Sequence, residues 1–140
     1  MALYCVDASA VLGWLLREEP VQTIRSFWLG LDASADRVIS AELLRPECTS
    51  VIWENVSNGR LTRSDGELLI GELVDLPIAA QPSMDQYRMA FDLAARFGRR
   101  KAYDMQYVAV AELAGAELVT LDGGQHQAAM ELRLPVRFLR

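Results

Sequence analysis

Cysteine and histidine are scarce in this chain, and their scarcity excludes several kinds of chemistry. The 140 residues contain two cysteines, Cys5 and Cys48, and one histidine, His126. Two cysteines without a C-x-x-C motif or a second histidine do not form a zinc site, and core thiols of a reducing cytoplasm are the expected state of both. One histidine without a G-x-S-x-G motif argues against a Ser-His-Asp hydrolase.

The sequence also has no phosphate-binding loop and only one lysine. No G-x-x-x-x-G-K-[ST] motif occurs, and Gly123-Gly124 is too short to cradle a nucleotide. An aspartyl-phosphate phosphatase or receiver domain uses acids at strand ends together with a lysine in a later loop. The only lysine here, Lys101, precedes Asp104 and Asp122, the last two acids found at the ends of predicted elements. Both nucleotide binding through such a loop and phosphoaspartate chemistry are therefore disfavoured.

No apolar run is long enough for a membrane span. Asp7 and Arg17 interrupt the apolar first twenty residues, and neither a basic leader nor a small-residue cleavage site accompanies them. The composition is 51% hydrophobic, and the chain has no repeat, linker or long polar tract. We expect a cytoplasmic protein made of one domain, residues 1–140.

Positive charge is in deficit, with 14 basic against 19 acidic residues and a net charge of −5. This balance argues against broad electrostatic capture of nucleic acid. Much of the positive charge is nevertheless concentrated in one segment, at Arg96, Arg99, Arg100 and Lys101. An acidic chain with one basic segment can contact nucleic acid locally or bind a basic protein partner, and both possibilities stay open.

Predicted strands alternate with predicted helices along the chain. Short β-type runs occur at residues 3–6, 37–40, 77–81 and 118–121. Between and after them, capping residues and apolar periodicity predict helices from Asp7-Ala8-Ser9 to about Arg17, from Pro20, over 44–58, after Thr62 or Ser64, from Ser83 to about Phe97, over 104–114 and over 125–132. This pattern predicts an α/β fold with a parallel sheet of four to five strands and helices on both faces.

Four carboxylates lie at the ends of these predicted elements. Asp7 and Asp122 each end a strand, Glu47 lies near the start of the helix 44–58, and Asp104 opens the helix 104–114. Ligands bind in the crevice outside the carboxyl ends of parallel strands, so Asp7 and Asp122 are expected to face one hollow. Several uncompensated carboxylates in one hollow hold protons or recruit a hard divalent cation. The pattern therefore predicts a Mg²⁺ or Mn²⁺ site.

These acids and their neighbours also have ordinary structural explanations. Asp104 can be a first-turn acid that the helix dipole favours, although its helix face is otherwise apolar. Thr120 shares a strand face with Asp122, so its hydroxyl can support that carboxylate, and Ser9 can support Asp7 in the same way. Ordinary capping and turn chemistry explains Ser9 equally well.

The basic run Arg99-Arg100-Lys101 lies in the loop just before Asp104. A phosphate backbone that approaches an acidic metal site needs cations at the rim of the site, which makes these residues candidates for contacts with a nucleic-acid backbone. The alternative is a solvated helix end with cations near its C-terminus. Glu54, two turns beyond Glu47, is expected to be exposed to solvent.

Several motifs together resemble the PIN-domain family, in particular the VapC-type toxins of toxin–antitoxin pairs. They are V-D-A-S-A-V-L at 6–12, R-P-E at 45–47 with G-R-L-T at 59–62, and A-Y-D-M-Q-Y-V-A at 102–109 leading into L-V-T-L-D at 118–122. The four acidic positions of the family fall on Asp7, Glu47, Asp104 and Asp122. The sequence departs from the family pattern at two places. Ser50 stands where the family often has Asn, and Gly123-Gly124 replaces a common basic-hydrophobic pair.

The resemblance implies Mg²⁺-dependent endoribonuclease activity on tRNA or ribosomal RNA and inhibition of translation. It implies direct metal binding by Asp7 and Asp104, with Glu47 and Asp122 binding a second ion or metal-bound water. It further implies a homodimer and a cognate VapB-type antitoxin that wraps the toxin and offers a basic residue to the acidic pocket. Core packing is expected for each tryptophan, with aromatic contact surface as the alternative: Trp14, Trp28 and Trp53. The rival function is a catalytically silent PIN-like module that binds a partner protein or metal.

Overall fold

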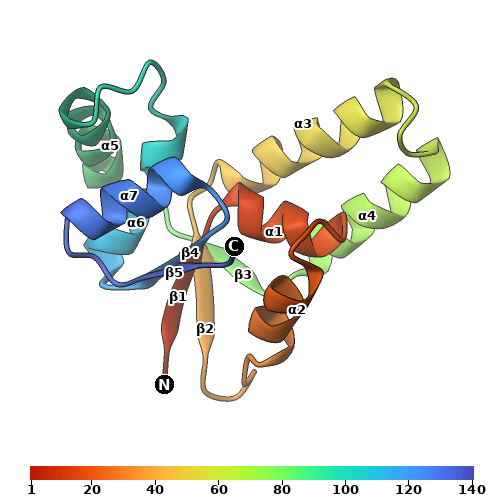
Figure 1. Ribbon diagram of the computed structural model, residues 1–140, viewed down its shortest axis with the longest axis horizontal. Coiled ribbons are helices and arrows are strands. Elements are labelled where there is room, and N and C mark those ends of the chain that lie inside the picture. Colours follow the sequence, from red (N-terminus) through yellow and green to blue (C-terminus); the bar gives the residue numbers. More distant parts are fainter.

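A parallel sheet of five strands runs through the middle of the molecule (Figure 1). The computed structural model describes all residues, 1–140. The strand order is β3-β2-β1-β4-β5, and every neighbouring pair is parallel. The strands are β1 (Leu3–Val6), β2 (Arg37–Ser40), β3 (Ile78–Ala80), β4 (Glu117–Thr120) and β5 (Val136–Phe138). The predicted α/β class is confirmed.

Seven helices flank this sheet (Figure 1). They are α1 (Ala8–Leu15), α2 (Val21–Leu29), α3 (Leu44–Ser57), α4 (Arg63–Asp75), α5 (Met84–Arg96), α6 (Tyr103–Ala114) and α7 (Gly123–Glu131). Helix α6 lies against β1, β2 and β4, and α5 packs on α6. Helices α3 and α4 form an antiparallel hairpin that projects away from the sheet.

The order of the strands places a switch point between β1 and β4. From β1 the chain first builds outward to β2 and β3, and it later returns to add β4 and β5 on the other side. In such a sheet the connections leaving the two central strands diverge and leave a crevice at their carboxyl ends. Asp7 directly follows β1, and Asp122 follows β4 after one residue. The topology therefore brings these two acids to the same edge of the sheet.

Local capping chemistry explains where several helices begin. The Asp7 carboxylate accepts a hydrogen bond from the Ala10 amide at 2.9 Å, and the Thr62 hydroxyl accepts one from the Asp65 amide at 3.0 Å. These contacts satisfy amides that have no partner within the first helical turn. Ser83 stands at the N-cap position of α5 but makes no such bond, so the expected cap is wrong there.

The C-terminal segment differs most from the sequence prediction. Helix α7 begins at Gly123 rather than Gln125, because the Asp122 carboxylate caps it by accepting from the Gln125 amide at 2.9 Å. Strand β5 was not predicted by residue range. It contains three residues at the edge of the sheet, and a run this short carries too little alternation to be recognised. Its pairing with β4 completes the sheet.

The core contains both cysteines, as expected, since Cys5 and Cys48 are fully buried. Trp14 and Trp28 are half-buried and pack against the core, with their ring centroids 6.1 Å apart. Trp53 is 59% exposed on the projecting helix α3, so the expectation of core packing is wrong for this tryptophan. No helix combines the length and apolar character needed to cross a membrane.

Candidate functional site

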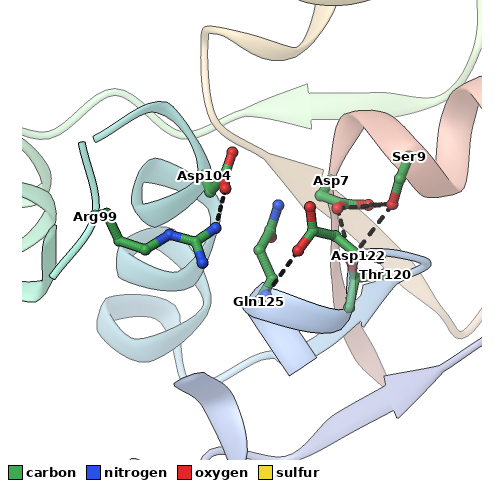
Figure 2. A network of polar contacts seen from close by, with 7 residues as sticks. All are labelled: Asp7, Ser9, Arg99, Asp104, Thr120, Asp122 and Gln125. Carbon is green, nitrogen blue, oxygen red and sulfur yellow. Dashed lines mark hydrogen bonds and ion pairs between the residues drawn. The ribbon is translucent and has the colours of Figure 1, made fainter. Parts of the chain in front are cut away.

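Polar side chains from four elements gather beyond the carboxyl ends of β1 and β4. Figure 2 shows two clusters: the polar contacts around Asp7 and Asp122, and the ion pair of Asp104 with a basic side chain of the preceding loop. The residues drawn are Asp7, Ser9, Arg99, Asp104, Thr120, Asp122 and Gln125.

Asp7 is 1% exposed and is held by three donors. Besides the Ala10 amide, the Ser9 hydroxyl lies 2.7 and 2.8 Å from its two carboxylate oxygens, and the Thr120 hydroxyl donates to Oδ2 at 2.6 Å. A carboxylate that leaves water needs such donors to stay ionised. The contact predicted between Ser9 and Asp7 is confirmed.

Thr120 supports a different carboxylate from the one expected. Its hydroxyl donates to Asp7 and accepts a hydrogen bond from the backbone amide of Asp122 at 2.9 Å, with no bond to the Asp122 carboxylate. The two-residue alternation no longer applies because β4 ends at Thr120 and Asp122 already caps the next helix. The parallel register of Val6 with Val119 instead brings Thr120 beside Asp7.

Glu47 lies in the first turn of α3 and is bound by a tyrosine of α6. The Tyr107 hydroxyl donates to Oε2 of Glu47 at 2.8 Å, and Tyr107 is 1% exposed. From the sequence, the helix face shared by Asp104 and Tyr107 was expected to be apolar apart from the acid, and Tyr107 was given no polar role. The available signal was its hydroxyl, because a buried tyrosine requires a polar partner.

Asp104 forms an ion pair with Arg99, which approaches it from the preceding loop (Figure 2). It lies in the first turn of α6, where the helix dipole favours an acid, but it does not cap the helix. Arg100 and Lys101 are exposed and form no ion pair. The three basic residues are therefore not equivalent in the structure.

Gln125 is a further polar residue of the site that the sequence did not indicate. Figure 2 shows its side chain between Asp104 and Asp122. Gln125 is 3% exposed, and its Oε1 atom is buried without a hydrogen-bond partner. A buried amide oxygen is costly without a partner, so this atom is available to accept a hydrogen bond in the site.

Burial and mutual repulsion disfavour the charged forms of two of the acids. Burial raises the pKa of Asp7 from its ordinary 3.8 to about 6; hydrogen bonds from Thr120, Ser9 and Ala10 oppose this shift, and the nearby Asp122 charge adds to it. Burial likewise raises the pKa of Glu47, against the bond from Tyr107 and together with the charges of Asp104 and Asp122. Each of the four acids thus acts electrostatically on at least one other.

Comparison with known families identifies the fold. The PIN domain family matches residues 4–130. The chain belongs to this family. No curated protein matches the sequence significantly.

Several solved structures are similar to this PIN domain. Mycobacterium tuberculosis VapC20, a Sarcin-Ricin loop cleaving toxin, has 17% identity and a TM-score of 0.66, over 89% of this chain and 94% of that one. VapBC-1 of nontypeable Haemophilus influenzae has 15% identity and a TM-score of 0.68, over 98% of both chains. FitAcB of Neisseria gonorrhoeae has 17% identity and a TM-score of 0.65, over 97% of both. At these identities the likeness shows a common fold.

The donor set of the PIN domain suits a hard divalent cation. All four acids offer oxygen, and one carboxylate oxygen of Glu47, Asp104 and Asp122 accepts no hydrogen bond from the protein. As the side chains stand, no three acids, cysteines or histidines are close enough to hold one ion together.

A groove lies apart from these acids, between α1, α2 and α4. It encloses about 970 Å³, and none of the four acids lines it. Its walls include apolar side chains of α1 and α4, among them Trp14, Leu68 and Leu69, with Arg25 and Glu72 also lining it. Leu68 is 69% exposed there. An apolar groove between helices with charges at its edges suits an amphipathic helix.

Proposed function

We propose that this protein is a Mg²⁺-dependent endoribonuclease toxin that cleaves structured RNA and thereby inhibits translation. The observation that carries the proposal is the gathering of Asp7, Glu47, Asp104 and Asp122 beyond the carboxyl ends of β1 and β4, with electrostatic repulsion among them. PIN domains are generally nucleases that depend on a divalent metal, which agrees with this donor set.

In this proposal Asp7 and Asp104 bind metal directly, and Glu47 and Asp122 bind a second ion or metal-bound water. Mg²⁺, or alternatively Mn²⁺, supplies positive charge that activates a water molecule and stabilises the leaving oxygen. Ser9 and Thr120 orient the Asp7 carboxylate, whose two oxygens both accept bonds in the free protein. An ionised carboxylate has about four acceptor sites, so Asp7 can keep its three donors and still bind a cation.

The RNA contacts are assigned to Arg99, Arg100 and Lys101, in the loop that borders Asp104. Cations at this rim compensate the repulsion between the acids and a phosphate backbone. Structured RNA, either tRNA or ribosomal RNA, is the proposed substrate, and the activity of the similar VapC20 on the Sarcin-Ricin loop supports this class.

We also propose that a VapB-type antitoxin neutralises the protein. Similar structures include toxin–antitoxin complexes, and the groove between α1, α2 and α4 suits a helix of such a partner. The protein is proposed to act in the cytoplasm and to form a homodimer, as is usual for the toxins it resembles.

The ion pair of Arg99 with Asp104 favours one alternative function. A guanidinium that permanently neutralises one of the acids would leave a catalytically silent PIN module that binds a partner protein or metal. Such a protein would release no RNA fragments under any metal condition.

Cleavage of a pool of structured RNAs separates these possibilities. We expect fragments with Mg²⁺ or Mn²⁺, none with EDTA, and none from Asp104→Asn. Asp92→Asn, an exposed acid of α5, is the matched control and should cleave like the wild type. Undiminished cleavage with EDTA would contradict the metal mechanism, and no cleavage by the wild type would favour the silent module.

A further inference from the structure

Arg99 is the only one of the three loop cations that is built into the acidic site. Its backbone amide donates to the Ala94 carbonyl at 2.8 Å, and its side chain is 27% exposed. Arg100 and Lys101 are exposed and unpaired. The fold therefore holds one arginine inside the site and leaves two cations at its rim.

The guanidinium of Arg99 lies against the backbone of Gly124. A Cβ atom added at Gly124 would lie 2.5 Å from Nη1, 3.0 Å from Nη2 and 3.2 Å from Cζ of Arg99. A Cβ added at the neighbouring Gly123 would contact nothing within 4 Å. Only glycine at position 124 leaves room for the guanidinium in this place.

Two opposing electrostatic forces act on the guanidinium of Arg99. It lies near the first turn of α7, where the helix dipole repels a cation. Asp104 supplies the opposing attraction, as Figure 2 shows. A divalent cation on the free oxygen of this partly exposed carboxylate weakens the ion pair, because the cation neutralises Asp104 and repels the guanidinium.

We propose that Arg99 exchanges anions during the reaction: it pairs with Asp104 in the free protein and binds a phosphate of the RNA when a divalent ion takes Asp104. The inference rests on the proposed function and deepens it. The planar guanidinium suits this exchange, because its donors match both carboxylate and phosphate in two-pronged contacts. Arg100 and Lys101, without an acid to leave, contribute only rim charge.

The exchange predicts effects of opposite sign from one substitution. Arg99→Gln frees Asp104, so the protein without RNA should bind Mn²⁺ more tightly, by about 1.5-fold to fivefold, the range for a partly exposed ion pair. The same variant loses the phosphate contact, so kcat/KM for RNA at saturating Mn²⁺ should fall about tenfold or more. Arg100→Gln is the matched control: its Mn²⁺ affinity should equal that of the wild type.

A second pair of variants tests the place of the guanidinium without removing its charge. Gly124→Ala should push the guanidinium away from Asp104 and tighten Mn²⁺ binding, while alanine remains a good helix residue. Gly123→Ala should leave Mn²⁺ affinity unchanged, because its Cβ meets no neighbour.

The measurements are isothermal titration of the full chain with Mn²⁺ alone and RNA cleavage at saturating Mn²⁺. Tighter Mn²⁺ binding by both Arg99→Gln and Gly124→Ala, with slower cleavage by Arg99→Gln, supports the exchange. Mn²⁺ affinities equal to or weaker than the wild type would overturn it, even if the wild type cleaves RNA. A wild type that cleaves no RNA would instead overturn the proposed function.

Discussion

The Tyr107 hydroxyl donates a hydrogen bond to Oε2 of Glu47 at 2.8 Å and so connects α6 to α3 across the site. Tyr107 is buried, and this carboxylate is the only hydrogen-bond partner of its hydroxyl. The bond leaves Oε1 of Glu47 free to face a cation. Tyr107 therefore acts as a positioning residue for one of the four acids.

Tyr107→Phe should weaken metal binding without unfolding the protein. Loss of the hydroxyl leaves the Glu47 side chain free to rotate, and outer-shell substitutions of this kind typically reduce metal affinity about tenfold. Titration with Mn²⁺ measures the effect. Tyr103→Phe on the same helix, where the tyrosine is 56% exposed, is the control. Equal affinities of the two variants would contradict a positioning role.

Glu47→Gln should abolish cleavage and stabilise the metal-free protein at neutral pH. Burial and the charges of Asp104 and Asp122 raise the pKa of Glu47, so its ionised form is destabilised in the folded state. The amide keeps an acceptor for Tyr107 but removes the charge. We expect kcat/KM to fall at least about 100-fold, beyond the effect of losing a supporting residue.

The melting temperature of Glu47→Gln in EDTA should exceed that of the wild type by about 2 °C or more at neutral pH. Glu54→Gln, which changes an exposed acid of the same helix, should alter neither property. A lower melting temperature for Glu47→Gln than for Glu54→Gln would show that the ionised carboxylate stabilises the fold.

Ionisation of Asp7 should make the metal-free protein less stable as the pH rises from about 4 to about 6. Its pKa is raised from 3.8 to about 6, so the folded protein keeps a proton that the unfolded chain has already lost. The protonated carboxyl group contributes its full stabilisation, about 3 kcal/mol at most, at a pH below the pKa of Asp7 in the unfolded chain. This stabilisation is lost as the pH rises through the pKa of Asp7 in the folded protein.

Asp7→Asn cannot titrate, which isolates this contribution. The free energy of unfolding, measured with urea in EDTA across this pH window, should shift in favour of the variant as pH rises. The difference between variant and wild type is the relevant quantity, because other acids titrate in both proteins. A difference independent of pH would show that Asp7 is ionised throughout.

Leu68→Glu should weaken binding of the proposed antitoxin. Leu68 lines the groove between α1, α2 and α4, and a charge placed there opposes burial of an apolar helix face. We expect at least about tenfold weaker binding of the protein encoded by the neighbouring open reading frame. Val74→Glu on the same helix is the control, since Val74 is 64% exposed and does not line the groove. Equal binding by both variants would place the partner elsewhere.

Local patterns in the sequence encode most of the strands and helices and the positions of the four acids. Local rules suffice for these features. Asp7 and Thr62 cap the helices that follow them, and Gly115 ends α6 in the left-handed conformation with φ of +65°. The acids at strand ends were recognisable because parallel strands direct their carboxyl ends to one edge.

The short edge strand β5 and the start of α7 required the tertiary structure. Three residues of β5 pair with β4, and a run of that length is too short for its alternation to identify a strand. The two glycines that open α7 are poor helix formers, and the cap from Asp122 sets the helix there.

The hydrogen-bond partners of Asp7 and Glu47 depend on contacts between elements that are far apart in the sequence. Thr120 reaches Asp7 across 113 positions of sequence, and Tyr107 reaches Glu47 across 60. Both contacts join separate elements, the first through the β1–β4 register and the second between α6 and α3, and no local pattern encodes them. The acids could be found from the sequence because their positions are local, whereas their hydrogen bonds and pKa values depend on neighbours that only folding supplies.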